Sequence, residues 1–489
     1  MSRNILFYVA ILLLFGGGIY FILHAGTTYR PLEKGDEIES RHPTSSSPAA
    51  QTNTIQPEST NTASFLRDNL RQPLSRLLLQ IIIIIIAARV VGNLFLKIGQ
   101  PAVVGEIIAG ILLGPSVLGF LSPATLGFLF PLSSLDALKL LSQIGVIIFM
   151  FIVGMEMNAR YLRERAEAAV IISHASIIVP FFLGVALALL IYPSLSGSGI
   201  SFNAFAPFMG IAMSITAFPV LARILDEHGI SNSYLGSIAI ACAAVDDATA
   251  WCLLAMVVAM VRANAPGTAI LTILLALLFT ATMIFLLKPR LNRLVEKIGK
   301  DKIPHRGWIS AILVFVFASA WLTELIGIHA LFGAFLAGAV MPSSVELRAY
   351  LKERLEAFSS ASLLPLFFAF TGLRTQINLL NDVQSWLLCA AVIGVAITGK
   401  LGGSMLAARW TGMTWRDSFA IGALMNTRGL VELIALNIGY DLGVLPARIF
   451  AIMVLMALVT TAMTGPLLSL ARGRAQEESV LVPSMDSAA

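Results

Sequence analysis

Two adjacent aspartates, Asp246 and Asp247, are the residues of this sequence that are best placed to do chemistry. They lie at the middle of an apolar run, within the string ACAAVDDATAW that covers residues 241–251. Consecutive residues of a helix point about 100° apart, so one carboxylate can face a cavity while the other faces a neighbouring helix. Burial in a low-dielectric site disfavours an ionised carboxylate, so a proton or a cation can satisfy the same oxygen atom. The pattern predicts a site at which cations and protons compete.

Competition for one carboxylate would couple the two ions. If both loads cannot be bound together, and the site opens to the other side only when one is bound, the cation moves against protons. The structural alternative is that the two aspartates only cap buried donors or form a fixed ion pair. An ionised side chain at the bilayer centre costs about 2.5–3.5 kcal/mol on insertion scales, and the small neighbours of this pair let an ion come close. Both points favour the functional interpretation.

Two other apolar runs are interrupted near their centres. In the run 203–225, Pro219 removes a backbone donor and disfavours helix at Phe218. In the run 416–438, the string NTRGLVE places charged and polar residues and a glycine at mid-span. Helices broken at corresponding positions of two halves indicate a transport site, because half-helix ends direct backbone dipoles towards an ion at the midplane. A proline kink alone is common in membrane helices, so the second run carries more of the argument.

A lysine lies inside a further apolar run. Lys400 belongs to the string ITGKLGG within the run 384–408, too far from either end for its ammonium group to reach water easily. An inverted repeat would bring this run near the aspartates, where the lysine could neutralise one of them. We therefore expect Lys400 to be an ion-pair partner, a proton carrier or both.

The composition is that of a membrane protein. Of the 489 residues, 57% are hydrophobic and 12% are charged, whereas a soluble domain is about half apolar and about one quarter charged. Apolar runs long enough to cross a bilayer, about 20 residues each, recur from Leu74 to Leu470. The net charge of +5 comes from lysines and arginines in short loops, so no nucleic-acid partner is expected. The three cysteines form no CxxC pair and indicate neither a disulfide framework nor a zinc site.

We predict an all-α membrane protein with about 13 transmembrane helices in one membrane domain, residues 73–471. Three of the predicted spans are short or interrupted. The spans are 74–96, 102–120, 138–156, 168–192, 203–225, 234–260, 266–287, 307–326, 328–342, 361–373, 384–408, 416–438 and 446–470.

The two ends of the chain are different in kind. Residues 1–26 contain an apolar run that is either a signal peptide or a retained anchor helix, and the lack of a clear small-residue cleavage site favours an anchor. Residues 27–72 are rich in Ser, Thr, Pro and Asn and are predicted to be a disordered linker. Residues 472–489 are expected to be a short cytoplasmic tail.

Lysines and arginines gather in alternate loops, while the intervening loops hold few charges. By the positive-inside rule the C-terminus is cytoplasmic, the linker is outside, and a retained first helix has its own N-terminus inside. The plasma (inner) membrane is the expected location. The basic loop residues are Arg160, Arg163 and Arg165; Arg223; Lys288, Arg290, Arg293, Lys297, Lys300, Lys302 and Arg306; Arg348, Lys352 and Arg354; Arg409 and Arg416; and Arg472 and Arg474.

Six ordered strings between Leu74 and Leu470 resemble one family. They are GEIIAGILLGP at 105–115, TAFPVLAR at 216–223, VDD at 245–247, HALFGAF at 329–335, GK at 399–400 and MNTRGLVELI at 425–434. The stretch resembles monovalent cation:proton antiporter family 2, which includes bacterial sodium/proton exchangers and plant exchangers of the CHX type. The resemblance implies two inverted repeats, two crossing broken helices, a dimerisation domain and an elevator-like motion. A homodimer is therefore expected.

The resemblance also implies roles for single residues. Asp247 is expected to bind the monovalent cation and the proton, and Asp246 to be its neighbour, alternately paired with Lys400. Thr216 and Asn426 are expected to be partners of the site in the crossing region. Arg428 and Glu432 are expected to form a supporting ion pair there.

The transported load is expected to be Na⁺ or K⁺ against protons, and no cofactor is expected. In this family the paired aspartates together with a membrane lysine imply more than one proton per cation. A relative gated by glutathione would carry a large cytoplasmic nucleotide-binding domain, for which the tail leaves no room. The alternative function is a cation channel or an uncoupled transporter, although no TVGYG filter is present. An enzyme is not expected: an intramembrane aspartyl protease needs its two aspartates on different helices.

Overall fold

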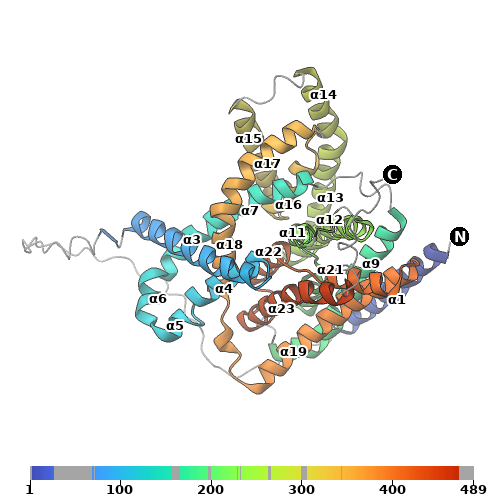
Figure 1. Ribbon diagram of the computed structural model, residues 1–489, viewed down its shortest axis with the longest axis horizontal. Helices are drawn as coiled ribbons and strands as arrows, with labels where there is room; N and C mark the ends of the chain where they lie inside the picture. Colours follow the sequence, from blue (N-terminus) through green and yellow to red (C-terminus); the bar gives the residue numbers. More distant parts are fainter. Residues whose placement is uncertain are drawn as a thin grey trace, which may run out of the picture.

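The chain folds as a bundle of helices, and the ranges that we describe contain no strand (Figure 1). The computed structural model describes residues 3–26, 69–70, 72–156, 166–195, 200–227, 229–231, 233–262, 266–298, 306–342 and 344–472. Most of the predicted linker 27–72, nearly all of the tail 472–489 and parts of two basic loops, 157–165 and 299–305, lie outside these residues. The predictions made for those segments therefore remain predictions.

Among the described residues, 11 helices are long and apolar enough to cross a membrane, or up to 12 if one bent pair is counted as a span. These correspond to all but one of the predicted spans, so the count of thirteen is not confirmed. The exception is 328–342, which contains only the ten-residue helix α16 (Ala330–Ala339). The predicted span 361–373 lies within a longer helical run, Glu346–Leu379.

The helices pack in two groups. In the first, which we call the site group, α9 packs against α10, α12 and α20, and α23 packs against α19, α21 and α22. The members of the site group are α9 (Ala166–Leu195), α10 (Phe202–Ser214), α11 (Phe218–Glu227), α12 (Tyr234–Arg262), α19 (Val383–Ile397), α20 (Gly403–Trp410), α21 (Trp415–Met425), α22 (Leu430–Asp441) and α23 (Ala447–Arg472).

In the second, which we call the flanking group, α4 packs against α3 and α18, and α16 packs against α7 and α15. Only sparse contacts, such as those of α18 with α22 and of α4 with α23, join the two groups. The members of the flanking group are α3 (Pro73–Lys97), α4 (Ala102–Leu113), α7 (Leu132–Glu156), α15 (Arg306–Ile326), α16, α17 (Val345–Phe358) and α18 (Leu364–Arg374).

Short helices connect the longer ones. Helices α5 (Leu118–Leu121) and α6 (Pro123–Leu129) join α4 to α7. In contrast, helix α13 (Pro266–Ala281), the π-helical segment η1 (Thr282–Leu287) and α14 (Lys288–Ile298) together contain a candidate membrane span, Ile270–Val295, between α12 and α15.

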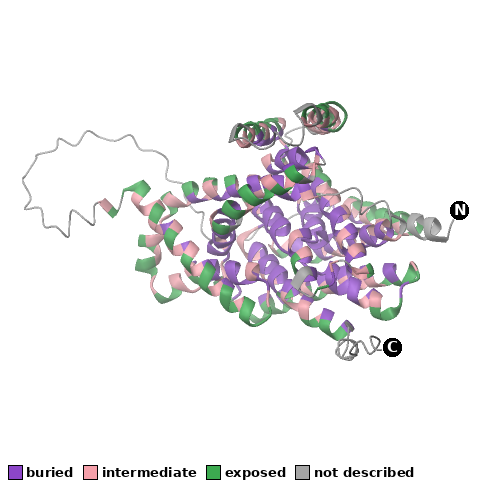
Figure 2. Ribbon diagram, turned by 45° about the horizontal axis from the view of Figure 1, so that its top comes forward, coloured by how far each residue is buried: buried purple, intermediate pink, exposed green. Residues whose placement is uncertain are grey.

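Buried residues concentrate at the centre of the bundle, and apolar side chains also cover its outside (Figure 2). Helix α3 shows this best, because one stripe with a spacing of four residues points outward. An outward apolar stripe of this length fits a helix that faces hydrocarbon. The backbone groups of such a helix are hydrogen-bonded within it, so its apolar side chains are what meets the lipid. The stripe consists of Leu78, Ile82, Ile86, Val90 and Leu94, each 51–63% exposed.

The N-terminal helix α1 (Arg3–Gly26) packs against α9 and α10 of the site group. The rings of Phe15 and Phe182 meet edge to face with centroids 5.2 Å apart. Ile22 is 9% exposed and belongs to the central core. The apolar run that the sequence left open between signal and anchor is therefore a helix seated on the bundle.

Candidate functional site

Two helix breaks meet at the centre of the site group. The first separates α10 from α11 at residues 215–217, and the second separates α21 from α22 at residues 426–429. The backbone N–H of Ala217 donates to the carbonyl oxygen of Thr427 at 3.0 Å, which joins the breaks directly. Gly429 permits this approach, because a Cβ there would lie 2.8 Å from Cγ2 of Val220. Both interruptions that the sequence predicts are present.

Asp246 lies on the unbroken helix α12 and is fully buried, with 0% exposure. Its Oδ1 accepts a hydrogen bond from the Ser173 hydroxyl at 2.5 Å. Its Oδ2 accepts from the hydroxyls of Ser176 at 2.7 Å and Thr216 at 2.6 Å, and from Nζ of Lys400 at 3.0 Å. Three hydroxyls and one ammonium group therefore surround this carboxylate.

Lys400 is equally buried and has an acceptor for each of its ammonium hydrogens. Besides Asp246, Nζ donates to the carbonyl oxygen of Ser176 at 2.9 Å and to that of Ser214. Lys400 lies in the π-helical segment η5 (Thr398–Gly402), which interrupts the otherwise continuous helix from α19 to α20. Segments of this kind are frequent at functional sites because the wider turn redirects a side chain.

Asp247, unlike Asp246, lacks hydrogen-bond donors in the described part of the chain. It is 1% exposed, and neither carboxylate oxygen has a hydrogen-bond partner among the described residues. The backbone N–H of Phe218, at the N-terminus of α11, lies near this carboxylate. A buried carboxylate without partners is costly in a membrane interior unless it is protonated or paired with a cation.

Arg428 and Glu432 form a second buried ion pair, with Nη1 and Oε1 3.2 Å apart and both side chains fully buried. The guanidinium group also donates to two carbonyl oxygens at the end of α10, those of Ala212 at 2.8 Å and Met213 at 2.7 Å. A cation at a helix C-terminus is stabilised by the helix dipole and by the unsatisfied carbonyls. Arg428 therefore ties the second break to the first.

The structure brings Thr216 and Lys400 to Asp246 and sets Arg428 beside Glu432. Asn426 is buried at the second break, where its Nδ2 donates to the carbonyl oxygen of Thr460 at 3.3 Å. Its Oδ1 has no partner among the described residues. Asn426 makes no recorded hydrogen bond to either aspartate.

Sequence reasoning missed the serines of α9. Ser173 and Ser176 reach Asp246 from a helix about 70 residues earlier in the chain, at sequence separations of 73 and 70. Two serines at a spacing of three share one face of a helix. The string SHAS in an apolar run was the available signal.

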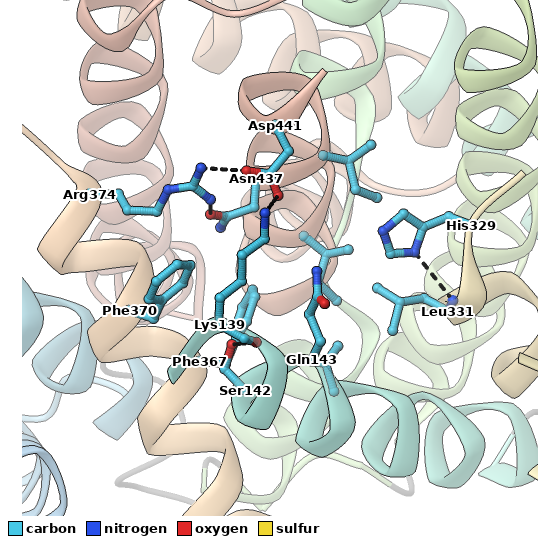
Figure 3. Close-up of a pocket in the computed structure, with 13 residues that line it drawn as sticks. Lys139, Ser142, Gln143, His329, Leu331, Phe367, Phe370, Arg374, Asn437 and Asp441 are labelled. Atoms are coloured by element: carbon cyan, nitrogen blue, oxygen red, sulfur yellow. Dashed lines mark hydrogen bonds and ion pairs between the residues drawn. The ribbon is translucent and has the colours of Figure 1, made fainter. Parts of the chain in front are cut away.

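A second polar cluster joins helices of the two groups (Figure 3). Asp441, at the end of α22, forms ion pairs with Lys139 of α7 at 2.9 Å and with Arg374 of α18. Arg374 also donates to Oδ1 of Asn437 at 3.0 Å. A cavity of about 400 Å³ lies beside this cluster, lined by Lys139, Gln143, Ile147, Arg262, Glu324, His329, Ala330, Leu331, Ile438, Asp441 and Leu442.

Comparisons with known proteins agree with this geometry. Residues 81–471 match the family described as sodium/hydrogen exchanger, transmembrane. The chain is 44% identical over 392 residues to the Na⁺/H⁺ antiporter NhaS4 of Synechocystis, and the match covers 80% of this chain and 96% of that protein. It is 40% identical to the cation/H⁺ antiporter 17 of Arabidopsis thaliana and 33% identical to the K⁺/H⁺ antiporter 1 of Saccharomyces cerevisiae.

The plant and yeast relatives are longer proteins. The matches cover 84% and 82% of this chain but 50% and 47% of those two relatives, so the chain spans about half of their length. The fold is similar to that of the sodium proton antiporter MjNhaP1 from Methanocaldococcus jannaschii. The TM-score is 0.60 at 12% sequence identity, over 81% of this chain and 96% of that one.

The apolar helices, the paired aspartates at a double helix break and the extent of the family match lead to one conclusion. This chain is an integral membrane protein that belongs to the sodium/hydrogen exchanger family of monovalent cation:proton antiporters.

Proposed function

We propose that this chain exchanges Na⁺ or K⁺ for protons by alternating access, with the cation and the proton competing for Asp247. One observation carries the proposal: the two adjacent aspartates are buried alike but are satisfied unequally. Asp246 has four donors, whereas Asp247 has no hydrogen-bond partner among the described residues. Asp247, which lacks partners among these residues, is the carboxylate that needs a bound proton or cation. A bound proton removes its charge and a bound cation compensates it, so each excludes the other.

The other charged groups of the site neutralise one another in pairs. Asp246 and Lys400 neutralise one another, so this pair adds no net charge near Asp247. Arg428 and Glu432 neutralise one another at the end of α10, and the N-terminus of α11 presents a positive dipole end beside the load. In such a surrounding the charge state of Asp247 decides the charge of the whole centre.

Access to the site requires a movement. Asp246 and Asp247 are 0% and 1% exposed, so among the described residues both side chains are closed off from the surface. The sparse packing between the site group and the flanking group makes their boundary the natural plane of movement. A shift of the site group as one body would carry Asp247 from one side to the other without separating the bonds of the two breaks.

The cation is Na⁺ or K⁺. The Synechocystis relative is named for Na⁺ and the yeast relative for K⁺, and the yeast match covers only about half of that protein. Oxygen ligand number and cavity size decide between the alkali ions. More than one proton per cation remains our expectation from the Asp246–Lys400 pair.

The test is exchange in proteoliposomes, with each alkali cation added in turn and the membrane potential clamped. We expect an internal pH-sensitive dye to report proton movement against the cation gradient for Na⁺ or K⁺. The potential at which this movement reverses gives the number of protons per cation. Cation flux that persists with no proton movement would instead support the channel or the uncoupled transporter.

The cluster at Asp441 provides a test of the movement itself. Asp441 belongs to the site group, and its partners Lys139 and Arg374 belong to the flanking group. If the groups shift, these ion pairs must open in every cycle. A short bifunctional thiol reagent that links Lys139→Cys to Asp441→Cys should therefore stop exchange, and a cleavable reagent should restore it.

The matched control for that cross-link lies within the site group. Arg448 of α23 pairs with Asp382, which precedes α19, at 3.4 Å. Linking Asp382→Cys to Arg448→Cys should leave exchange intact, because both residues move together. Both pairs are made after replacement of the three native cysteines, Cys242, Cys252 and Cys389. Undiminished exchange by fully linked 139–441 protein contradicts a movement along this boundary.

The proposal also includes the location and the topology of the chain. We propose the plasma (inner) membrane, a cytoplasmic C-terminus and a homodimer. The packing of α1 on α9 and α10 supports a retained helix in place of a cleaved signal, with its N-terminus inside. An epitope tag placed before Arg3 should stay with the mature protein in the membrane fraction. A mature N-terminus after residue 26, read by mass spectrometry, would show that the segment is removed.

A further inference from the structure

We infer that Ser173, Ser176 and Pro180 of α9 are positioning residues that keep Lys400 seated on Asp246 and away from Asp247. The inference rests on the proposed function, in which Asp247 carries the load. It adds a reason why the nearby lysine does not occupy the load site itself.

The two serine hydroxyls hold both oxygens of Asp246. Ser173 donates to Oδ1 at 2.5 Å, and Ser176 donates to Oδ2 at 2.7 Å. No other hydrogen bond to Oδ1 is recorded, so Ser173 fixes the rotation of the carboxylate about its last bond. With that rotation fixed, Oδ2 stays 3.0 Å from Nζ of Lys400.

Pro180 frees a second acceptor for the lysine. In an α-helix the N–H of residue 180 would donate to the carbonyl oxygen of Ser176, but proline has no N–H. That oxygen accepts instead from Nζ of Lys400 at 2.9 Å. The two helices also touch here, because a Cβ at Gly399 would lie 3.0 Å from Cα of Pro180. Ser176 therefore contacts both members of the ion pair, through its hydroxyl and its carbonyl.

The position of the Lys400 ammonium group matters because this group is itself a monovalent cation. Lys400 is close enough to Asp247 to interact with it through space, and the Asp247 oxygens lack hydrogen-bond partners among the described residues. A lysine released from its three acceptors would be drawn to that carboxylate. It would then compete with the transported ion from within the protein.

The test is the double variant Ser173→Ala/Ser176→Ala in proteoliposomes. We expect the apparent KM for the cation to rise at least about ten-fold, because the variant loses two hydrogen bonds to a charged group and each corresponds to an equilibrium change of about ten-fold or more. The maximal rate at saturating cation should be retained, because a competitor is displaced by excess substrate. Threonine at both positions keeps the hydroxyls and should restore the KM.

Ser404→Ala is the matched control. Ser404 is equally buried, lies one turn after Lys400 and has a hydroxyl with no partner among the described residues. Its removal should leave KM unchanged. A fall in maximal rate with an unaltered KM in the double serine variant would indicate a merely structural role and would overturn the inference.

A second variant weakens the hold on the Lys400 ammonium group in another way. Pro180→Ala supplies an N–H to the Ser176 carbonyl and should also raise the KM, whereas Pro466→Ala in α23 should not. Pro180→Ala decides the matter if the double serine variant does not fold, and an unchanged KM there contradicts the inference. If Asp247→Asn retained exchange, the proposed function would fail instead, which is a separate result.

Discussion

Asp247→Asn is expected to abolish cation-driven proton movement in proteoliposomes while the protein remains folded. Asparagine has nearly the same shape, but it carries no charge to hold a cation and no carboxyl proton to release. Because neither carboxylate oxygen has a partner among the described residues, the change removes no recorded hydrogen bond. An internal pH-sensitive dye measures the activity, and gel filtration in detergent measures folding.

The control is an aspartate of the flanking group. Asp136→Asn changes the same chemistry on α7, outside the site group, and should leave exchange unaltered. Asp247→Asn protein that exchanges at the normal rate would remove the central role assigned to this residue. Loss of exchange together with loss of a folded peak would instead point to a structural role.

Arg428→Leu is expected to destabilise the protein strongly. The substitution leaves Glu432 as an unpaired buried charge and deprives the carbonyls of Ala212 and Met213 of their donor. Removing one member of a buried ion pair costs about 3–5 kcal/mol. Thermal unfolding followed in detergent should therefore show a much lower midpoint than that of the unaltered protein.

The double variant Arg428→Leu/Glu432→Leu separates the charge from the rest of the loss. If an unpaired carboxylate causes most of the destabilisation, removing it should recover a large part of the midpoint, because apolar replacement of a whole buried pair is often neutral. A double variant that unfolds as early as Arg428→Leu would mean that the carbonyl contacts to α10 dominate.

The chemistry-bearing residues could be predicted because charge inside an apolar run is conspicuous. The adjacent pair Asp246 and Asp247, and the single Lys400, lie among small or aliphatic neighbours. The same contrast exposed the second helix break, where Arg428 and Glu432 interrupt the run. A proline marked the first break. These signals are local and need no knowledge of which helices touch.

The serines of α9 could not be assigned in the same way. A serine in a membrane helix commonly bonds its own backbone, as Ser319 does with the carbonyl oxygen of Phe315 at 2.8 Å. Their spacing of three in the string SHAS places them on one face of a helix, but it does not tell which helix that face meets. Their role depends on α9 packing against α12, a contact between segments about 70 residues apart.

The number of spans shows another limit. The apolar run continues through Gly327, but the chain turns there with a φ of 96°. His329 then caps the N-terminus of α16, which ends after only ten residues. Hydropathy reports how apolar a segment is and not how long its helix continues, so it placed 328–342 among the candidate spans.

The wide turn at Thr398–Gly402 has a consequence for comparing this chain with its kin. A π-helical turn holds one residue more than an α-helical turn, so everything after it is rotated by about 100° relative to an uninterrupted helix. A homologue without the extra residue would need its lysine at a neighbouring position to reach the same carboxylate. Sequence alignments should therefore match such lysines by their direction around the helix axis. Deletion of Gly402 should restore an α-helical turn and leave Trp410 and its neighbours on α20 facing the same way.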